Sequence, residues 1–179
     1  ESVNYGRIGT PTSHAFEEAV TALHGGLKTV SLPSGLSAIV TALMAFLENG
    51  DHVLMCDTVY GPTRARGCEH LLARAGVETT YYDPLIGAGI AELIRPNTKV
   101  IYMESPGSLT FEVQDVPAIA AAARDKGVVT MIDNTWASPF LCRPLELGVD
   151  VVIEAATKYI SGHSDAMLGA VTMATDEHF

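Results

Sequence analysis

The sequence has few cysteines, and none of them forms a recognisable pair. Its three cysteines, Cys56, Cys68 and Cys142, lie far apart along the chain. A disulfide-stapled scaffold is excluded, because such small secreted domains carry many closely spaced cysteines. The absence of a CxxC pair also removes the usual sign of a structural zinc site or a dithiol redox motif. We therefore expect a reducing compartment, the cytoplasm, and no metal centre.

Basic residues are scarce as well. Eleven lysines and arginines stand against 21 acidic residues, which gives a net charge of -10 at pH 7. A chain of this charge repels phosphate backbones and anionic lipid surfaces, so we expect neither nucleic acid nor a membrane as a partner. No apolar run is long enough to span a bilayer, and no basic segment leads into an apolar stretch as in a signal peptide.

Several familiar ligand-binding motifs are missing. The sequence contains no GxGxxG fingerprint, no Walker A lysine loop and no HExxH pair. The segment 161–165 contains serine, histidine and aspartate but lacks the strand-to-elbow context of a GxSxG nucleophile. Dinucleotide binding, nucleotide hydrolysis and serine hydrolase chemistry therefore have no support in the sequence.

Apolar residues, in contrast, are plentiful. They make up 47% of the 179 residues, and only 18% are charged, which is typical of a folded globular protein. Short β-branched runs alternate with amphipathic stretches, which predicts an α/β fold: a mostly parallel sheet with helices on both faces. The chain has no internal repeat or linker, so we expect one domain over residues 1–179. The expected strands are 29–32, 52–56, 78–82, 100–104, 128–133, 151–155 and 167–174, and the expected helices are 36–47, 63–75, 90–94 and 116–126.

Two charged residues stand out at the ends of apolar strands. Asp133 ends the strand 128–133, and Lys158 follows the strand 151–155, where each charge is costly unless it has a partner. The two could form a buried ion pair, or Lys158 could point to solvent. They could also face one pyridoxal 5'-phosphate (PLP) molecule, with the lysine amine as Schiff-base nucleophile and the carboxylate as partner of the ring nitrogen. Gly35 and Leu36, expected at a helix N-terminus, would then offer N–H groups to the phosphate.

Longer motifs carry a resemblance to a known family. They include SGLSA at Ser34, VYGPT at Val59, ESPGS at Glu104, IDNTW at Ile132 and TKYISGHSD at Thr157. With these motifs the sequence resembles the Cys/Met-metabolism family of PLP enzymes, and most closely its bacterial cystathionine β-lyase branch. The resemblance implies the large cofactor domain of a fold-type I PLP enzyme. It also implies β-elimination of cystathionine to homocysteine, pyruvate and ammonia.

The resemblance also implies roles for individual residues. Lys158 matches the lysine that binds the cofactor and moves protons, Asp133 the partner of the ring nitrogen, and Tyr60 the tyrosine that stacks on the ring and helps to move protons. Gly35 and Leu36 match backbone donors to the phosphate. The remaining matches are Thr157, a hydroxyl that reaches the same phosphate, and Tyr5 with Arg7, which bind the phosphate of a neighbouring subunit in a homodimer or homotetramer.

Other functions stay open from the sequence. The same cofactor could serve a γ-lyase, a γ-synthase or a cysteine desulfhydrase of the same family. Members of the family are longer than this chain, and the resemblance implies that their C-terminal domain holds the substrate carboxylate. A piece that contains only the cofactor domain, and that is not catalytic alone, is therefore the alternative from another class.

Overall fold

The computed structural model describes residues 5–179, and its strands form one sheet. The order across the seven-stranded sheet is β1-β7-β6-β5-β4-β2-β3. The pairs β2–β3, β2–β4, β4–β5 and β5–β6 are parallel, and β7 runs antiparallel to both β1 and β6. The predicted, mostly parallel sheet is therefore confirmed. The strands are β1 Lys28–Leu32, β2 His52–Cys56, β3 Glu78–Tyr82, β4 Thr98–Glu104, β5 Val129–Asp133, β6 Val151–Glu154 and β7 Gly169–Met173.

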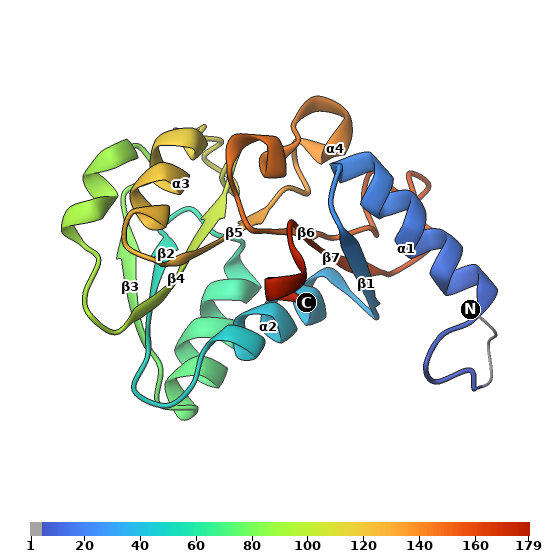
Figure 1. Cartoon of the computed structure of the whole chain (residues 1–179), viewed down its shortest axis with the longest axis horizontal. Helices are drawn as coiled ribbons and strands as arrows, with labels where there is room; N and C mark the ends of the chain where they lie inside the picture. Colours follow the sequence, from blue (N-terminus) through green and yellow to red (C-terminus); the bar gives the residue numbers. More distant parts are fainter. Residues whose placement is uncertain (1–4) are drawn as a thin grey trace.

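Helices cover both faces of this sheet, as expected. Figure 1 shows α2 and the helix η1 on one side of the strands and α3 on the other. The α-helices are α1 Pro11–His24, α2 Gly35–Phe46, α3 Val116–Arg124 and the short α4 Ser138–Leu141. The π-helix η1 spans Thr63–Leu72, and the 3₁₀ turns are η2 Gly87–Glu92, η3 Pro144–Leu147 and η4 Asp176–His178.

Three local features differ from the sequence-based prediction. The helix α1, which packs on β1 and β7, was not predicted at all. The expected α-helix 63–75 is π-helical over most of its length, and the expected helix 90–94 is a 3₁₀ turn that begins earlier, at Gly87. These differences concern the type and bounds of helices and leave the order of the predicted strands unchanged.

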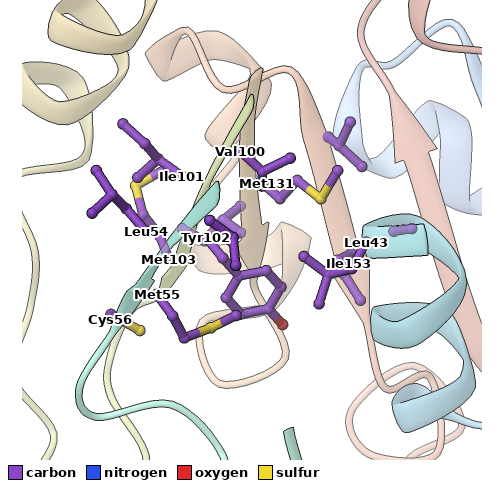
Figure 2. Close-up of a cluster of buried hydrophobic side chains, with 14 of the residues drawn as sticks. Leu43, Leu54, Met55, Cys56, Val100, Ile101, Tyr102, Met103, Met131 and Ile153 are labelled. Atoms are coloured by element: carbon purple, nitrogen blue, oxygen red, sulfur yellow. The ribbon is translucent and has the colours of Figure 1, made fainter. Parts of the chain in front are cut away.

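The core lies between the central strands and α2. All five residues of β2 are buried, as are six of the seven residues of β4, because helices cover both faces of these parallel strands. Figure 2 shows the buried side chains of Leu54 and Met55 from β2, Tyr102 from β4 and Ile153 from β6, together with Leu43 from α2. This packing fixes the carboxyl ends of the central strands relative to α2. Within residues 5–179, no helix combines the length and apolarity needed to cross a membrane.

Candidate active site

A cavity of about 900 Å³ lies where the predicted site residues meet. It is lined by the start of α2, the ends of β4 and β5, and the turns that follow β2 and β6. Ligands bind at such carboxyl ends of strands in open α/β sheets. The cavity brings together six of the eight residues that the sequence singled out. They are Gly35, Leu36, Tyr60, Asp133, Thr157 and Lys158.

The other two predicted residues lie elsewhere. Tyr5 and Arg7 precede α1, both are exposed, and the Arg7 guanidinium carbon lies 5.4 Å from the centre of the Tyr5 ring. Neither residue lines the cavity of this chain. The predicted role toward a neighbouring subunit's phosphate stays a prediction, since it concerns a second chain.

The N-terminus of α2 forms one wall of the cavity. Ser34 is the N-cap residue, and its Oγ accepts a hydrogen bond of 3.1 Å from the backbone N–H of Ser37. The first N–H groups of a helix have no partner inside the helix, so those of Gly35 and Leu36 stay available to an anion. A Cβ atom on Gly35 would lie 2.5 Å from the Cβ of Ala155. The glycine therefore lets the helix start sit directly against the end of β6.

Asp133 is the buried acid of the site. It is the last residue of β5, is only 7% exposed, and accepts a hydrogen bond of 3.0 Å from the backbone N–H of Thr135. Burial, together with the smaller effect of the nearby Glu154, raises its pKa to about 6, although the hydrogen bonds with Thr135 lower it. A positively charged group in the cavity would stabilise the ionised form of such a buried carboxyl group.

The amine of the site belongs to Lys158. The strand β6 ends at Glu154, and Lys158 lies in the turns beyond it with an exposed side chain, which is one of the alternatives that the sequence left open. No ion pair with Asp133 forms among residues 5–179, which excludes the buried pair that the sequence left open. Backbone hydrogen bonds to Ala155 and from Gly162 hold the residue in place. Lys158 is the only lysine or arginine among the described residues that line the cavity.

Tyr60 and Thr157 complete the predicted set. The Tyr60 side chain is 47% exposed, and its backbone N–H donates a hydrogen bond of 2.7 Å to Glu104 Oε2. The Thr157 hydroxyl donates to the carbonyl oxygen of Leu168 at 3.1 Å and accepts from its N–H at 2.9 Å. To reach a phosphate, this hydroxyl has to turn its hydrogen away from Leu168.

Glu104 is a cavity residue to which the sequence gave no role. It ends β4, is only 4% exposed, and pairs in register with Asp133 on the neighbouring strand. Burial and, second to it, the charge of Asp133 raise its pKa to about 8, against the hydrogen bonds from Tyr60 and Ser108, which lower it. The sequence places Glu104 at the end of the expected strand 100–104, but the closeness of the two carboxyl groups depends on the order of the strands.

This set of groups fits PLP. The cavity offers a primary amine on Lys158, a buried carboxylate on Asp133 and free N–H donors at the start of α2, which suit an aldehyde, a ring nitrogen and a phosphate. Among residues 5–179, no three histidine, cysteine, aspartate or glutamate side chains form a group that could hold a metal ion.

Comparisons with known proteins agree with this fit. The model of the family described as Cys/Met metabolism PLP-dependent enzyme matches residues 1–179. The cystathionine beta-lyase MetC of Escherichia coli is 50% identical over 167 residues, which cover 92% of this chain and 42% of that protein. The cystathionine beta-lyase of Salmonella typhimurium is 48% identical over the same shares of both chains.

A solved structure shares the fold closely. The cystathionine gamma-lyase from Lactobacillus plantarum, solved in complex with L-serine, has a TM-score of 0.95 and 35% sequence identity. The match covers 99% of this chain and 46% of that one. The chain thus spans less than half the length of the relatives that it matches.

Proposed function

Because the chain belongs to the Cys/Met metabolism family of PLP-dependent enzymes, we propose that it provides the cofactor-binding domain of a cystathionine β-lyase. The proposed reaction is the β-elimination of cystathionine to homocysteine, pyruvate and ammonia. The observation that carries the proposal is the meeting of Lys158, Asp133 and the start of α2 in one cavity. The β-lyase names of the relatives at 50% and 48% identity support the choice of reaction.

In this proposal each cavity residue has one task toward PLP. The Nζ of Lys158 binds the cofactor, and the N–H groups of Gly35 and Leu36, with the Thr157 hydroxyl, donate to the phosphate. The carboxylate of Asp133 holds a proton on the ring nitrogen, and the Tyr60 ring packs against the cofactor. When bound, PLP supplies a ring that withdraws electrons from the α-carbon of the substrate.

Lys158 then acts as the base. Its amine takes the proton from the α-carbon of cystathionine, and the bond between the β-carbon and sulfur breaks, with homocysteine as the leaving group. An exposed lysine at the mouth of the cavity has room to move between the cofactor and the substrate. We further propose a homodimer or homotetramer that works in the cytoplasm, in which Tyr5 and Arg7 serve the neighbouring subunit's phosphate.

Lys158→Ala tests the central assignment. In the longest available form of the protein we expect this variant to lose the visible absorption of lysine-bound PLP together with turnover of cystathionine, since no other lysine or arginine of the described chain lines the cavity. Lys126→Ala removes an exposed lysine beyond the end of α3 and serves as the matched control. Survival of both signals in Lys158→Ala would overturn the proposal.

The products of cystathionine cleavage decide between the branches of the family. We expect pyruvate, which reports β-cleavage, whereas 2-oxobutyrate reports γ-cleavage. The second outcome would favour a γ-lyase, the name of the structural relative at 35% identity. PLP binding without any turnover in the longest available form of the chain would favour a non-catalytic role.

A further inference from the structure

Two carboxyl groups lie next to each other at the bottom of the cavity. Glu104 and Asp133 are the last residues of neighbouring parallel strands and pair in register. Both side chains are buried, at 4% and 7% exposure, and both line the cavity. Two buried carboxyl groups at such a site cannot both carry a charge without a large electrostatic cost, so one of them keeps a proton.

The surroundings of Glu104 offer it no cation. The titratable groups that face it are Asp133 on β5, Cys56 on β2 and Tyr102 on its own strand, and all of these are neutral or negative. Lys158 lines the same cavity, but within residues 5–179 no ion pair includes Glu104. Burial and the Asp133 charge raise the pKa of Glu104 to about 8, against the hydrogen bonds from Tyr60 and Ser108, which lower it, whereas burial raises that of Asp133 only to about 6. Of the two in-register carboxyl groups, Glu104 is therefore the one that we expect to hold the proton at neutral pH.

Glu104 also holds the tyrosine of the site. Its Oε2 accepts a hydrogen bond of 2.7 Å from the backbone N–H of Tyr60, in the turn that follows β2. Its backbone carbonyl accepts a hydrogen bond of 2.9 Å from the side-chain amide of Gln114, which fixes the end of β4 from the other side. The side chain thus connects the end of β4 to the turn that carries Tyr60.

We propose that Glu104 is a positioning residue: it stays protonated at neutral pH, leaves the negative charge of the carboxyl pair on Asp133, and anchors the turn that carries Tyr60. This inference rests on the proposed function of Asp133 and Tyr60 toward PLP. When Glu104 is neutral, no second carboxylate charge repels that of Asp133, and the pKa of Asp133 is not raised by it. Asp133 then remains an anion for the ring nitrogen of the cofactor.

The proton on Glu104 is testable without cofactor. A carboxyl whose pKa is raised in the folded state stabilises the fold below its unfolded value of 4.5, and this stability is lost as the pH rises through about 8. Glu104→Gln is permanently neutral and keeps an acceptor oxygen, so its free energy of unfolding should fall less than that of the wild type over this range. Urea unfolding of the cofactor-free protein at a series of pH values measures the difference. Glu92→Gln, at an exposed glutamate, is the matched control and should keep the slope of the wild type.

The hydrogen bond between Glu104 and the turn that carries Tyr60 needs a separate measurement. PLP titration of the longest available form of the protein should show that Glu104→Gln binds the cofactor about fivefold more tightly than Glu104→Ala, since only glutamine keeps the hydrogen bond from Tyr60. Equal affinities would overturn the anchoring role. Equal pH dependence of Glu104→Gln and wild type would overturn the proton assignment. Failure of the proposed function appears separately, as turnover that survives in Lys158→Ala.

Discussion

At the scale of single residues, the burial of the Asp133 carboxyl group is the main electrostatic feature of this site. The side chain is almost fully buried, and burial raises its pKa against the hydrogen bonds with Thr135, which lower it. The protein alone stabilises such an anion poorly, and a cationic ring nitrogen bound beside it would stabilise it. Such unfavourable placement of a charge is typical of functional rather than structural residues.

Asp133→Ala separates binding of the cofactor from its activation. We expect turnover of cystathionine to fall by orders of magnitude while PLP is partly retained, because attachment needs only the Lys158 amine whereas the ring nitrogen loses its partner. Steady-state rates and the absorption of bound PLP measure the two effects. Asp125→Ala, at an exposed aspartate after α3, is the control. Unchanged activity in Asp133→Ala would show that this carboxylate is only structural.

Asp133 and Lys158 could be predicted because each follows an apolar strand within a recognisable motif. The same argument applies to Glu104, since it also ends an apolar strand. Its importance comes from the partner on β5, and no local pattern reveals which strands are neighbours. The sequence left open whether Lys158 is buried or exposed, because it does not mark the end of β6 at Glu154 or the turns that follow.

At the scale of elements, the contact between α2 and β6 controls the phosphate end of the cavity. The helix begins at Gly35, and the absent side chain of this glycine lets its backbone approach Ala155. The sequence predicted a helix N-terminus at Gly35 and Leu36, because an apolar run follows them. The closeness to Ala155 could not be predicted, since it joins segments that are 120 residues apart.

Gly35→Ala should disturb this contact. The added Cβ would lie 2.5 Å from the Cβ of Ala155 and 3.0 Å from its Cα, so α2 has to move. We expect a loss of about 1–3 kcal/mol in the free energy of unfolding, together with weaker PLP binding, as measured by urea unfolding and PLP titration. In Gly67→Ala the nearest atom lies 3.9 Å away, so this helical control should be neutral or slightly stabilising. A Gly35→Ala variant that matched the wild type in both measurements would contradict this account of the helix start.

The helix α1 shows why an element with clear end signals can escape prediction. Thr10 and Ser13 form a capping box, Pro11 occupies the first turn, and Gly25 ends the helix in a left-handed conformation. Its buried residues are only Val20 and His24, so the apolar period along the helix is weak. His24 Nε2 lies 3.4 Å from Glu154 Oε1 inside the protein, a polar contact that no hydrophobic pattern predicts.

At the scale of the whole molecule, the direction of β7 departs from the simple alternation of strands and helices. The strand inserts between β1 and β6 and runs antiparallel to both. Periodicity identifies a buried strand but carries no information on its direction, so the sequence predicted the sheet without this reversal. The connection from β6 to β7 contains Lys158, and the reversal brings this connection back over the cavity.

Several large apolar side chains of the described chain are exposed, one of them at the cavity. Leu109 and Phe140 are about nine-tenths exposed, at 89% and 90%, and Met167 at the cavity is 71% exposed. Large exposed apolar side chains at a site are typical of surfaces that other protein segments cover. The cavity of the described chain also contains no arginine, the residue that binds a carboxylate through two parallel hydrogen bonds.

These two features predict the behaviour of the 179 residues taken alone. An amino-acid substrate would bind without a bidentate partner for its carboxylate, which costs roughly 2–5 kcal/mol if that contact is a buried charge pair. We therefore expect the 179-residue chain to bind PLP weakly or not at all, and to cleave cystathionine far more slowly than a relative of full length. Parallel assays of pyruvate release and PLP absorption on this chain and on any longer form of it measure the difference. Full specific activity from the 179 residues would contradict the prediction, because a group of this chain without a role in the proposal would then have to hold the substrate carboxylate.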